Sequence, residues 1–168
     1  MAHPPVSVDL RPLEATDAPL LRAIREQPAV LAWWGPLEPD FPFEVDDEVR
    51  LTILADGQVA GMIQFGEEPD PDYRYATIDL FVDAALHGRG IGTAAIRAVL
   101  RELHETRGHH RVTIDPAADN ATAIRVYERV GFRPVGVLHR SERDRSTGEW
   151  RDQLLMEWLA DAPRADGY

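Results

Sequence analysis

The sequence predicts a mixed α/β fold, in which helices are inserted between the strands of one sheet. Short strand-like segments dominate the middle of the chain, and amphipathic helical segments follow the first, fourth and fifth of them. The chain has 168 residues, of which 44% are hydrophobic, and this is enough for one compact core and too little for two ordinary domains. We therefore expect a single domain over residues 1–168, with a flexible tail from about residue 161.

The elements of the first half follow from apolar spacing and from the residues at their ends. In chain order they are a strand at Val6–Leu10, a helix at about Asp17–Arg25 capped by Thr16, a short helix at Pro28–Trp34 closed by Gly35 and Pro36, strands at Arg50–Ala55 and Gln58–Phe65 around the hairpin signal Asp56-Gly57, and a strand at Tyr75–Val82. In the last strand, Ile78, Leu80 and Val82 share one face, and Thr77, Asp79 and Phe81 share the other.

The second half alternates helices and strands. The predicted elements are a helix at Gly90–Glu105 with apolar residues on one face, a strand at Arg111–Asp115, a helix at Ala121–Val130 stopped by Gly131, and strands near Arg133–His139 and Trp150–Leu159.

Charge is distributed unevenly along the chain. All 18 basic residues are arginine, and residues 1–86 carry 17 Asp or Glu and 5 Arg, whereas residues 87–168 carry 12 and 13. This asymmetry indicates two faces with different partners, although a general acidic bias is the simpler explanation. The acidic half argues against nucleic-acid binding, because backbone phosphates require a cationic surface.

Several other classes are excluded by composition. The chain has no cysteine, which excludes disulfides, cysteine zinc sites and a thiolate nucleophile. His109-His110 lacks a third ligand at recognisable spacing, so we expect no metal site. The longest apolar run, Ala29–Trp34, is too short to span a bilayer, and Met1–Pro5 lacks the features of a signal peptide. We expect a soluble cytoplasmic protein.

A glycine-rich loop, His87-Gly88-Arg89-Gly90-Ile91-Gly92-Thr93, lies between a strand and an amphipathic helix. Glycines let the chain approach a ligand closely, and the N-terminus of the helix favours an anion such as a phosphate or pyrophosphate. Thr93 replaces the third glycine of the dinucleotide fingerprint, and the chain has no lysine for a P-loop. A glycine turn with no ligand is the alternative.

A second segment runs from Asn120 to Phe132 and is typical of a helix that is capped by Asn120 and ended by Gly131. Asn120 can serve as a simple N-cap, contact a ligand or do both. Tyr127 shares a helical face with Ile124, so it can equally be a core aromatic residue.

Together these segments resemble the GNAT superfamily of acetyl-CoA-dependent N-acetyltransferases. Its pyrophosphate motif, Gln/Arg-x-x-Gly-x-Gly/Ala, is matched by His87-Gly88-Arg89-Gly90-Ile91-Gly92, with His87 as the departure. Further short matches resemble the aminoglycoside 6'-N-acetyltransferases: Ala32-Trp33-Trp34-Gly35, Thr77-Ile78-Asp79, Asp115-Pro116, Asn120, Ala123-Ile124-Arg125 and Tyr127-Glu128. The resemblance implies a mostly antiparallel sheet of six to seven strands, flanked by about four helices and splayed between the fourth and fifth strands, after Val82 and Asp115.

The resemblance also implies how the coenzyme is bound. The backbone from Arg89 to Thr93, including Gly90, Ile91 and Gly92, would hold the pyrophosphate beside His87, and Asn120 would bind the pantetheine amides. A backbone N–H around Phe81–Val82 would bind the thioester carbonyl, where a fixed donor stabilises developing negative charge. Tyr127 matches the general acid that protonates the leaving thiolate.

Carboxylates are expected on the amine side. Asp is disfavoured in the middle of a strand, so Asp79 is interpreted either as an amine anchor or general base, or as a carboxylate paired with Arg74 or another surface group. Asp115 is a second anchor by resemblance, or a turn-forming Asp-Pro. Trp33 and Trp34 either wall the acceptor site or pack in the core. Acidic loops would border this cleft, or be merely solvated: Glu38, Asp40, Glu44, Asp46, Asp47, Glu48, Glu67, Glu68, Asp70 and Asp72.

The leading hypothesis is direct acetyl transfer from acetyl-CoA to a primary amine of an aminoglycoside or a similar polycation, by a monomer or homodimer. The alternatives are the same chemistry on a protein N-terminus or a small metabolite amine, and a non-catalytic acyl-CoA sensor.

Overall fold

The computed structural model describes residues 6–44 and 46–161. Its helices and strands, in chain order, are β1 (Val8–Pro12), α1 (Ala18–Arg25), α2 (Pro28–Trp34), β2 (Val49–Ala55), β3 (Gln58–Glu68), β4 (Tyr75–Val82), α3 (Ile91–Arg101), β5 (Arg111–Ile114), α4 (Ala121–Val130), β6 (Arg133–Arg143) and β7 (Trp150–Leu159). The expected tail lies outside the described residues beyond Asp161.

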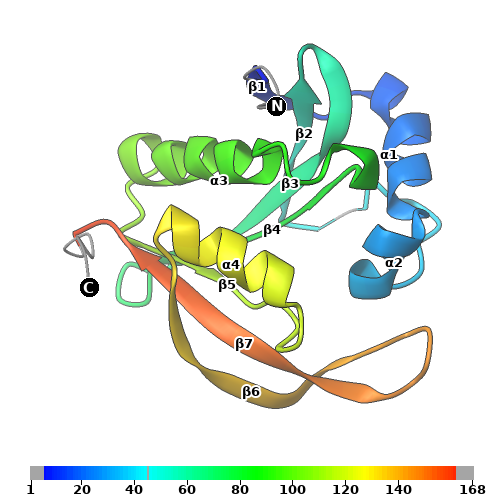
Figure 1. Ribbon diagram of the computed structural model, residues 1–168. Helices are drawn as coiled ribbons and strands as arrows, with labels where there is room; N and C mark the ends of the chain where they lie inside the picture. The colour runs from blue at the N-terminus through cyan, green and yellow to red at the C-terminus, as the bar shows by residue number, and fades with distance from the viewer. Residues whose placement is uncertain (1–5, 45, 162–168) are drawn as a thin grey trace.

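The described strands form one seven-stranded sheet in the order β1-β2-β3-β4-β5-β7-β6. All neighbouring strands are antiparallel except β4 and β5, which run parallel. Figure 1 shows α3 and α4 on the near side of the sheet, with α1 and α2 beside its N-terminal half. The predicted mixed, mostly antiparallel sheet with four α-helices is therefore confirmed.

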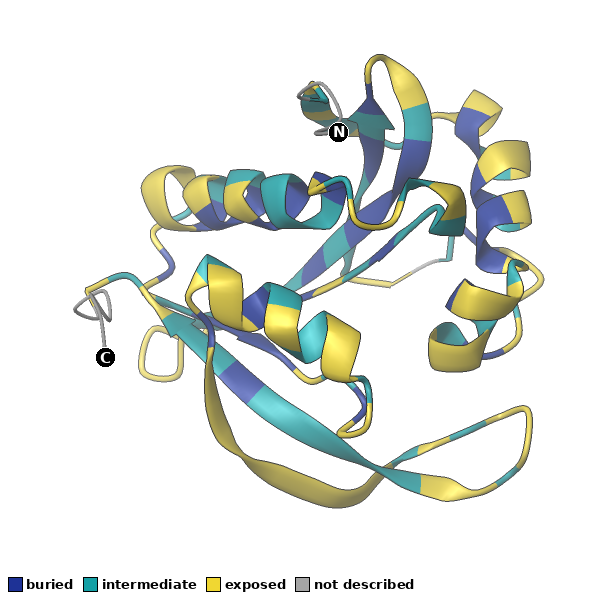
Figure 2. Ribbon diagram, in the orientation of Figure 1, coloured by how far each residue is buried: buried dark blue, intermediate teal, exposed yellow. Residues whose placement is uncertain are grey.

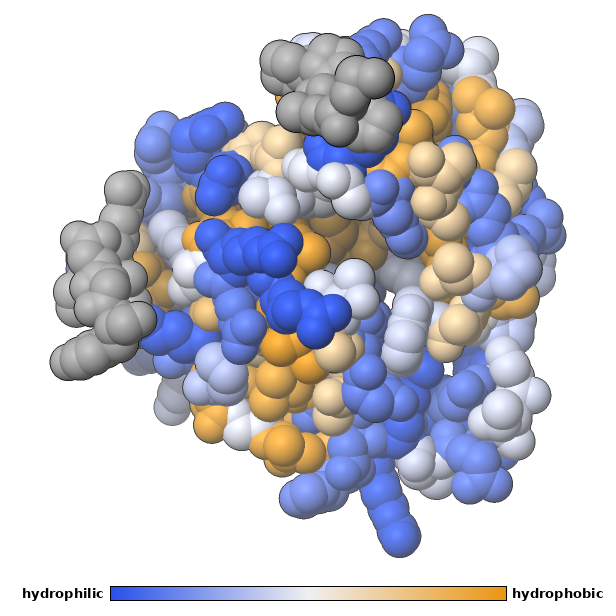
Figure 3. Space-filling view, in the orientation of Figure 1, coloured by the Kyte–Doolittle hydropathy of each residue, from blue (hydrophilic) through white to orange (hydrophobic). Residues whose placement is uncertain are grey.

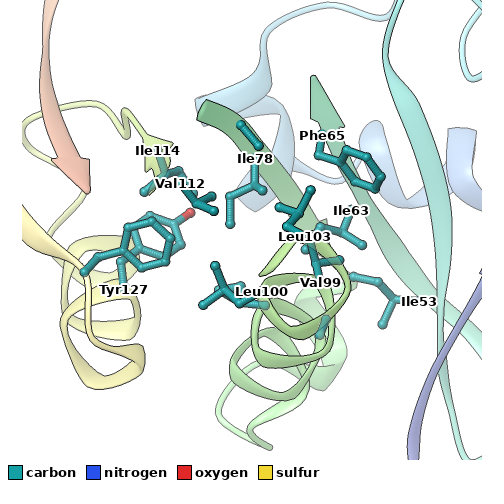
Figure 4. Packing of buried hydrophobic residues seen from close by; sticks show 14 of the residues in the cluster. Ile53, Ile63, Phe65, Ile78, Val99, Leu100, Leu103, Val112, Ile114 and Tyr127 are labelled. Carbon is teal, nitrogen blue, oxygen red and sulfur yellow. The ribbon is translucent and has the colours of Figure 1, made fainter. Parts of the chain in front are cut away.

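Two apolar clusters hold the layers together. The larger one lies between the sheet and α3 and α4, and it includes Ile63, Ile78, Val99 and Tyr127 (Figure 4). The smaller one joins α1 and α2 to the opposite face of the sheet through Met62 and Phe81. The predicted alternation in β4 is thereby confirmed, since Ile78 and Phe81 belong to different clusters.

The hairpin between β2 and β3 forms where it was expected. Asp56 and Gly57 have φ angles of 49° and 78°, as a two-residue turn of this kind requires, and β2 pairs with β3 on either side. The strands themselves differ from the prediction at their ends. β1 begins two residues late, while β3 continues to Glu68 and β6 continues to Arg143.

The predicted cap of the first helix is wrong. Thr16 lies inside a 3₁₀ turn at Ala15–Asp17, and this turn is preceded by Glu14. The buried carboxylate of Asp17 accepts hydrogen bonds from Arg11, from the Thr52 hydroxyl and from the N–H of Glu14. The contacts of Asp17 with β1 and β2 therefore outweigh the preference of Thr16 for the capping position. The predicted helix at Gly90–Glu105 also changes its geometry, because its last turn, Glu102–Thr106, is a π-helix.

The two halves of the sheet differ in how deeply their residues are buried. Figure 2 shows the central strands and the inner side of α3 as buried, while β6 is exposed along nearly its whole length. β6 forms the edge of the sheet and pairs only with β7 among the described strands. The β6–β7 hairpin extends below α4 toward α2 in Figure 1.

Candidate functional site

The main cleft opens where β4 and β5 separate. These strands pair only at Ala76 with Val112 and at Thr77 with Thr113. The separation thus begins earlier than the expected position after Val82 and Asp115, because the buried Tyr127 side chain of α4 lies against this junction (Figure 4). The cleft has a volume of about 640 Å³. Figure 3 shows this side of the molecule, where a hollow opens between the helices.

Nearly all of the predicted site residues line this cleft. The lining includes Trp33, Trp34, Asp79, Phe81, Val82, His87, Gly90, Ile91, Gly92, Thr93, Asp115, Asn120 and Tyr127. Arg89 is the exception, because its side chain is half-buried outside the lining and its Nε has no hydrogen-bond partner. We name the two parts of the cleft the glycine-loop end, residues 87–93 with the start of α4, and the tryptophan end, formed by Trp33, Trp34, Asp79, Asp115 and Glu142.

The glycine-loop end is built from backbone. Gly88 and Gly90 have φ angles of 78° and 79°, which L side chains rarely adopt, and Gly90 is the N-cap of α3. The first bond of the helix runs from the Ala94 N–H to the Gly90 carbonyl, so the N–H groups before Ala94 have no intrahelical acceptor. This combination of free donors and a helix N-terminus suits a phosphate.

The His87 side chain closes the turn after β4. Its Nε2 donates to the Val82 carbonyl at 2.9 Å, which fixes the tautomer at that nitrogen. The ring is therefore engaged with its own turn, and the loop offers mainly backbone groups to a ligand.

The edge of β4 that faces the cleft is not paired with β5 beyond Thr77. The Leu80 N–H bonds the Asp79 carboxylate at 2.8 Å, while the Asp83 N–H bonds the Ala60 carbonyl of β3. Since successive N–H groups of a strand point to opposite edges, the Val82 N–H shares the open edge with that of Leu80. The Val82 N–H is therefore a candidate for the donor that the resemblance implied.

Asp79 reaches into the cleft from the middle of β4. The surrounding protein weakens the hydration of its carboxylate, and Asp115, Glu48 and Glu142 add negative charge, so that its pKa rises to about 7 despite the opposing bond from Leu80. The suggested pairing with Arg74 is wrong, because Arg74 donates to the Arg107 carbonyl instead.

Tyr127 is 7% exposed and lies between the two strands that separate. Burial, followed by the charges of Asp79 and Asp115, raises its pKa above the ordinary value, so that the phenol stays protonated at neutral pH. It is both a core residue, packed against Phe132, and part of the cleft lining. Both interpretations of Tyr127 are therefore compatible.

Asn120 and Asp115 border the same region. The Asn120 side chain accepts a hydrogen bond from the Ala123 N–H at 3.2 Å, which makes it the N-cap of α4 as predicted. Burial and then Glu142 raise the pKa of Asp115.

The tryptophan end combines aromatic and acidic side chains. Trp34 packs edge-on against Phe81 with 5.2 Å between ring centroids, whereas Trp33 is 37% exposed. Glu142 of β6 and Gln153 of β7 also line the cleft and were not expected there. Gln153 donates to the Asp115 carbonyl at 2.9 Å. Sequence patterns missed Glu142 because the predicted strand ended at His139.

The acidic loops do not line this cleft. Glu38 pairs with Arg145, Glu44 and Asp46 pair with Arg50, and Glu67 pairs with Arg107 and His109. Of the four carboxylates that do line it, only Asp79 comes from the acidic half, and Asp115, Asp119 and Glu142 come from the other half. The carboxylates of the lining therefore come mainly from the second half of the chain, while arginines pair with four of the ten carboxylates of the acidic loops.

Neither a metal-binding cluster nor a membrane-spanning helix is found among the described residues. No group of three or more His, Asp or Glu is arranged there to hold a metal ion, and His109 is buried against Glu67. None of the described helices combines the length and hydropathy needed to cross a membrane.

Comparisons with known proteins agree with this geometry. The model of the acetyltransferase (GNAT) family matches residues 9–132. The chain is 27% identical over 156 residues to an aminoglycoside N(6')-acetyltransferase type 1 from Klebsiella pneumoniae, covering 79% of this chain and 77% of the relative. It is 38% identical over 84 residues to the N-alpha-acetyltransferase RimI from Mycobacterium tuberculosis, covering 50% and 49%.

A solved structure gives the same result at the level of the fold. Mycobacterium smegmatis RimJ in complex with CoA-disulfide superposes with a TM-score of 0.77 and 26% identity, covering 91% of this chain and 82% of that one. The chain therefore belongs to the acetyltransferase (GNAT) family and is an acetyl-CoA-dependent N-acetyltransferase.

Proposed function

We propose that the enzyme transfers acetyl from acetyl-CoA directly to a primary amine of a cationic acceptor, of which an aminoglycoside 6'-amine is the leading case. The supporting observation is a group of three carboxylates, Asp79, Asp115 and Glu142, whose charges act on one another beside two tryptophans. Among the described residues, neither Asp79 nor Asp115 forms an ion pair. The charge of Arg25 acts on Asp79, and Arg151 pairs with Glu142, so the group still carries a net negative charge. An amine-rich acceptor would supply the missing positive charge.

The glycine-loop end fits the coenzyme. The backbone N–H groups at Gly90–Thr93 and the N-terminus of α3 would hold the pyrophosphate, while His87 supports the loop through Val82 and Arg89 contributes its backbone. Asn120 and the free edges of β4 and β5 would bind the pantetheine arm. The cleft crosses the sheet between these strands, so it connects this end with Asp79.

Asp79 would accept the proton of the amine. With a pKa of about 7, it is partly ionised at neutral pH and can take a proton from an ammonium group, directly or through water. The amine nitrogen then forms a bond to the thioester carbonyl carbon, the carbon–sulfur bond breaks, and the nitrogen releases its second proton to solvent. The Val82 N–H stabilises the oxyanion, and Tyr127 donates its proton to the departing sulfur before solvent reprotonates it.

Trp33 and Trp34 would form the wall against which the acceptor lies. Trp33 is exposed toward the cleft, and Trp34 is supported by Phe81 from behind. Asp115 and Glu142 would bind further amino groups of the acceptor. The relative from Klebsiella pneumoniae, named for acetylating aminoglycosides, supports this assignment. We also propose a cytoplasmic location and a monomer or homodimer.

A protein N-terminus is the second candidate, because the RimI relative is 38% identical over half of this chain. The test is thiol release from acetyl-CoA with an amine panel, comparing aminoglycosides that carry a 6'-amino group with matched 6'-hydroxyl compounds and with peptides. We expect turnover only with the 6'-amino compounds. Turnover with peptides alone would contradict the aminoglycoside proposal, and coenzyme binding without any turnover would contradict acetyl transfer.

A further inference from the structure

Five consecutive carbonyl groups at the C-terminal end of α2 accept hydrogen bonds from arginine side chains. Arg151 binds the carbonyls of Ala32 and Trp33 at 3.3 and 2.8 Å. Arg25 and Arg145 bind the three carbonyls that follow, those of residues 34, 35 and 36. The three arginines come from α1, from the tip of the β6–β7 hairpin and from β7.

These hydrogen bonds stabilise the C-terminal end of α2. The helix has only seven residues, so it is too short to be stable by itself, and the last carbonyls of any helix lack partners within it. Guanidinium groups satisfy these carbonyls and oppose the negative end of the helix dipole. The position of Trp33 and Trp34 therefore depends on arginines from elsewhere in the chain.

Arg25 differs from the other two arginines. It is 3% exposed, and its guanidinium lies about 5 Å from the ring centroids of Trp34 and Phe41. Loss of this residue would disrupt the smaller apolar cluster. Arg25 is thus unsuitable for a test of the site alone.

Arg151 connects the two walls of the tryptophan end. Its Nε donates to the Glu142 carboxylate at 2.8 Å, while its two terminal nitrogens donate to α2. One planar group thus orients a carboxylate of the cleft and the helix that carries both tryptophans. At the hairpin tip, Arg145 adds a second link, since it binds Glu38 and the Pro36 carbonyl.

We propose that Arg151 is a positioning residue for the acceptor, holding Glu142 and the α2 tryptophans at a fixed separation by tying the β6–β7 hairpin to α2. The proposal deepens the proposed function and rests on it for the identity of the acceptor. Arg151 itself does not line the cleft, so it acts through the groups that it holds.

Arg111 provides a matched control. Its Nε also donates to a glutamate across a strand pair at 2.8 Å, that of Glu157, and the exposures of the two ion pairs are similar. Arg111 has no hydrogen bond to α2 and is not part of the cleft lining. Replacement of either arginine removes a comparable ion pair, but only Arg151 links the hairpin to the helix.

The kinetic test compares Arg151→Gln with Arg111→Gln, using the best amine of the panel. We expect Arg151→Gln to raise the acceptor KM by about tenfold, with the KM for acetyl-CoA nearly unchanged and kcat reduced less than twofold. Arg111→Gln should leave all three unchanged. Arg151→Lys should recover only part of the effect, because one ammonium cannot reproduce the forked contacts.

A distance measurement tests the same proposal without an acceptor. Because the chain has no cysteine, the paired substitutions Glu26→Cys on the C-cap of α1 and Ser146→Cys at the hairpin tip can be spin-labelled selectively. We expect one narrow distance distribution, which Arg151→Gln broadens and Arg111→Gln does not.

The two measurements must change together. A raised acceptor KM with an unchanged distance distribution, a broadened distribution with an unchanged KM, or no change in either would overturn the positioning role. Failure of the proposed acceptor is a separate result, since it would appear as a different preferred amine in the unsubstituted enzyme. Arg151 would then be tested on that amine, and the distance distributions would be unaffected.

Discussion

The two ends of the cleft are constructed in different ways. The glycine-loop end is local, because one segment of seven residues and the helix that follows it supply the donors from backbone N–H groups. The tryptophan end is assembled from α2, β4, β5 and β6, and it is held by arginines that are distant in sequence. One short segment can thus form a site for the coenzyme, which is the same in every reaction of this kind. A site for the acceptor, which differs between enzymes, depends on side chains that can change independently.

Tyr127→Phe should have the largest effect, since it removes the proposed proton donor at the junction of the two ends. We expect kcat to fall by about 10²-fold or more, as for the loss of a general acid. Coenzyme affinity should be unchanged, because the ring and its packing against Phe132 remain. Single-turnover rates and calorimetric titration with coenzyme A measure the two quantities. Wild-type turnover in this variant would remove Tyr127 from the mechanism.

Asp79→Asn tests whether the tryptophan end depends on charge. With its pKa raised to about 7, Asp79 is protonated below that pH and ionised above it, so kcat/KM for the acceptor should rise with pH and level off above about 7. The variant should lose this rising limb of the pH profile, and its kcat/KM should be about 1% of the wild-type plateau value or less. Rates measured with one acceptor between pH 5.5 and pH 9 would show this loss, because the range extends about one pH unit or more to either side of the pKa. An unchanged profile would assign the limb to the acceptor's own amine.

Gly90→Ala tests the glycine-loop end of the cleft. At a φ of 79°, an L side chain costs about 1 kcal/mol or more, and the new methyl group would strain the loop that offers the N–H groups. We expect the KM for acetyl-CoA to rise by about tenfold while the acceptor KM changes little. Gly57→Ala, at a φ of 78° in the distant β2–β3 hairpin, is the matched control for backbone strain. Equal effects of the two substitutions would indicate a general loss of stability.

The smallest predicted effect concerns stability. The folded-state pKa of Asp79 lies above the ordinary value of 3.8, so folding favours its protonated form, and its contribution to stability is lost as the pH rises toward 7. Because Asp79 is exposed to the open cleft and water screens part of this effect, Asp79→Asn should raise the melting temperature only slightly at pH 8 and have no such effect at pH 4. Differential scanning calorimetry at both pH values tests this, and a destabilised variant at pH 8 would contradict the raised pKa.

The largest difference between sequence and structure lies in the charge. The acidic half of the chain suggested a negatively charged border for the cleft, but Arg50, Arg107 and Arg145 pair with its loops. Two of these arginines come from the second half, at positions that no periodicity relates to their partners. Net charge by region could not reveal this, because neutralisation depends on which side chains meet in three dimensions.

The sequence by itself determined the features that local geometry controls. Periodicity located the strands and helices, Asp56-Gly57 predicted the hairpin and Asn120 predicted the cap of α4. The glycine loop predicted an end of the cleft whose geometry suits a phosphate. Each of these features depends on backbone preferences within a few residues. Only the tertiary structure decided that Glu142 enters the cleft and that Arg151 ties the β6–β7 hairpin to α2. The contacts between Arg151 and α2 join residues more than a hundred positions apart. Local sequence preferences cannot predict such contacts, because they form only when the folded sheet brings its edges close to α2.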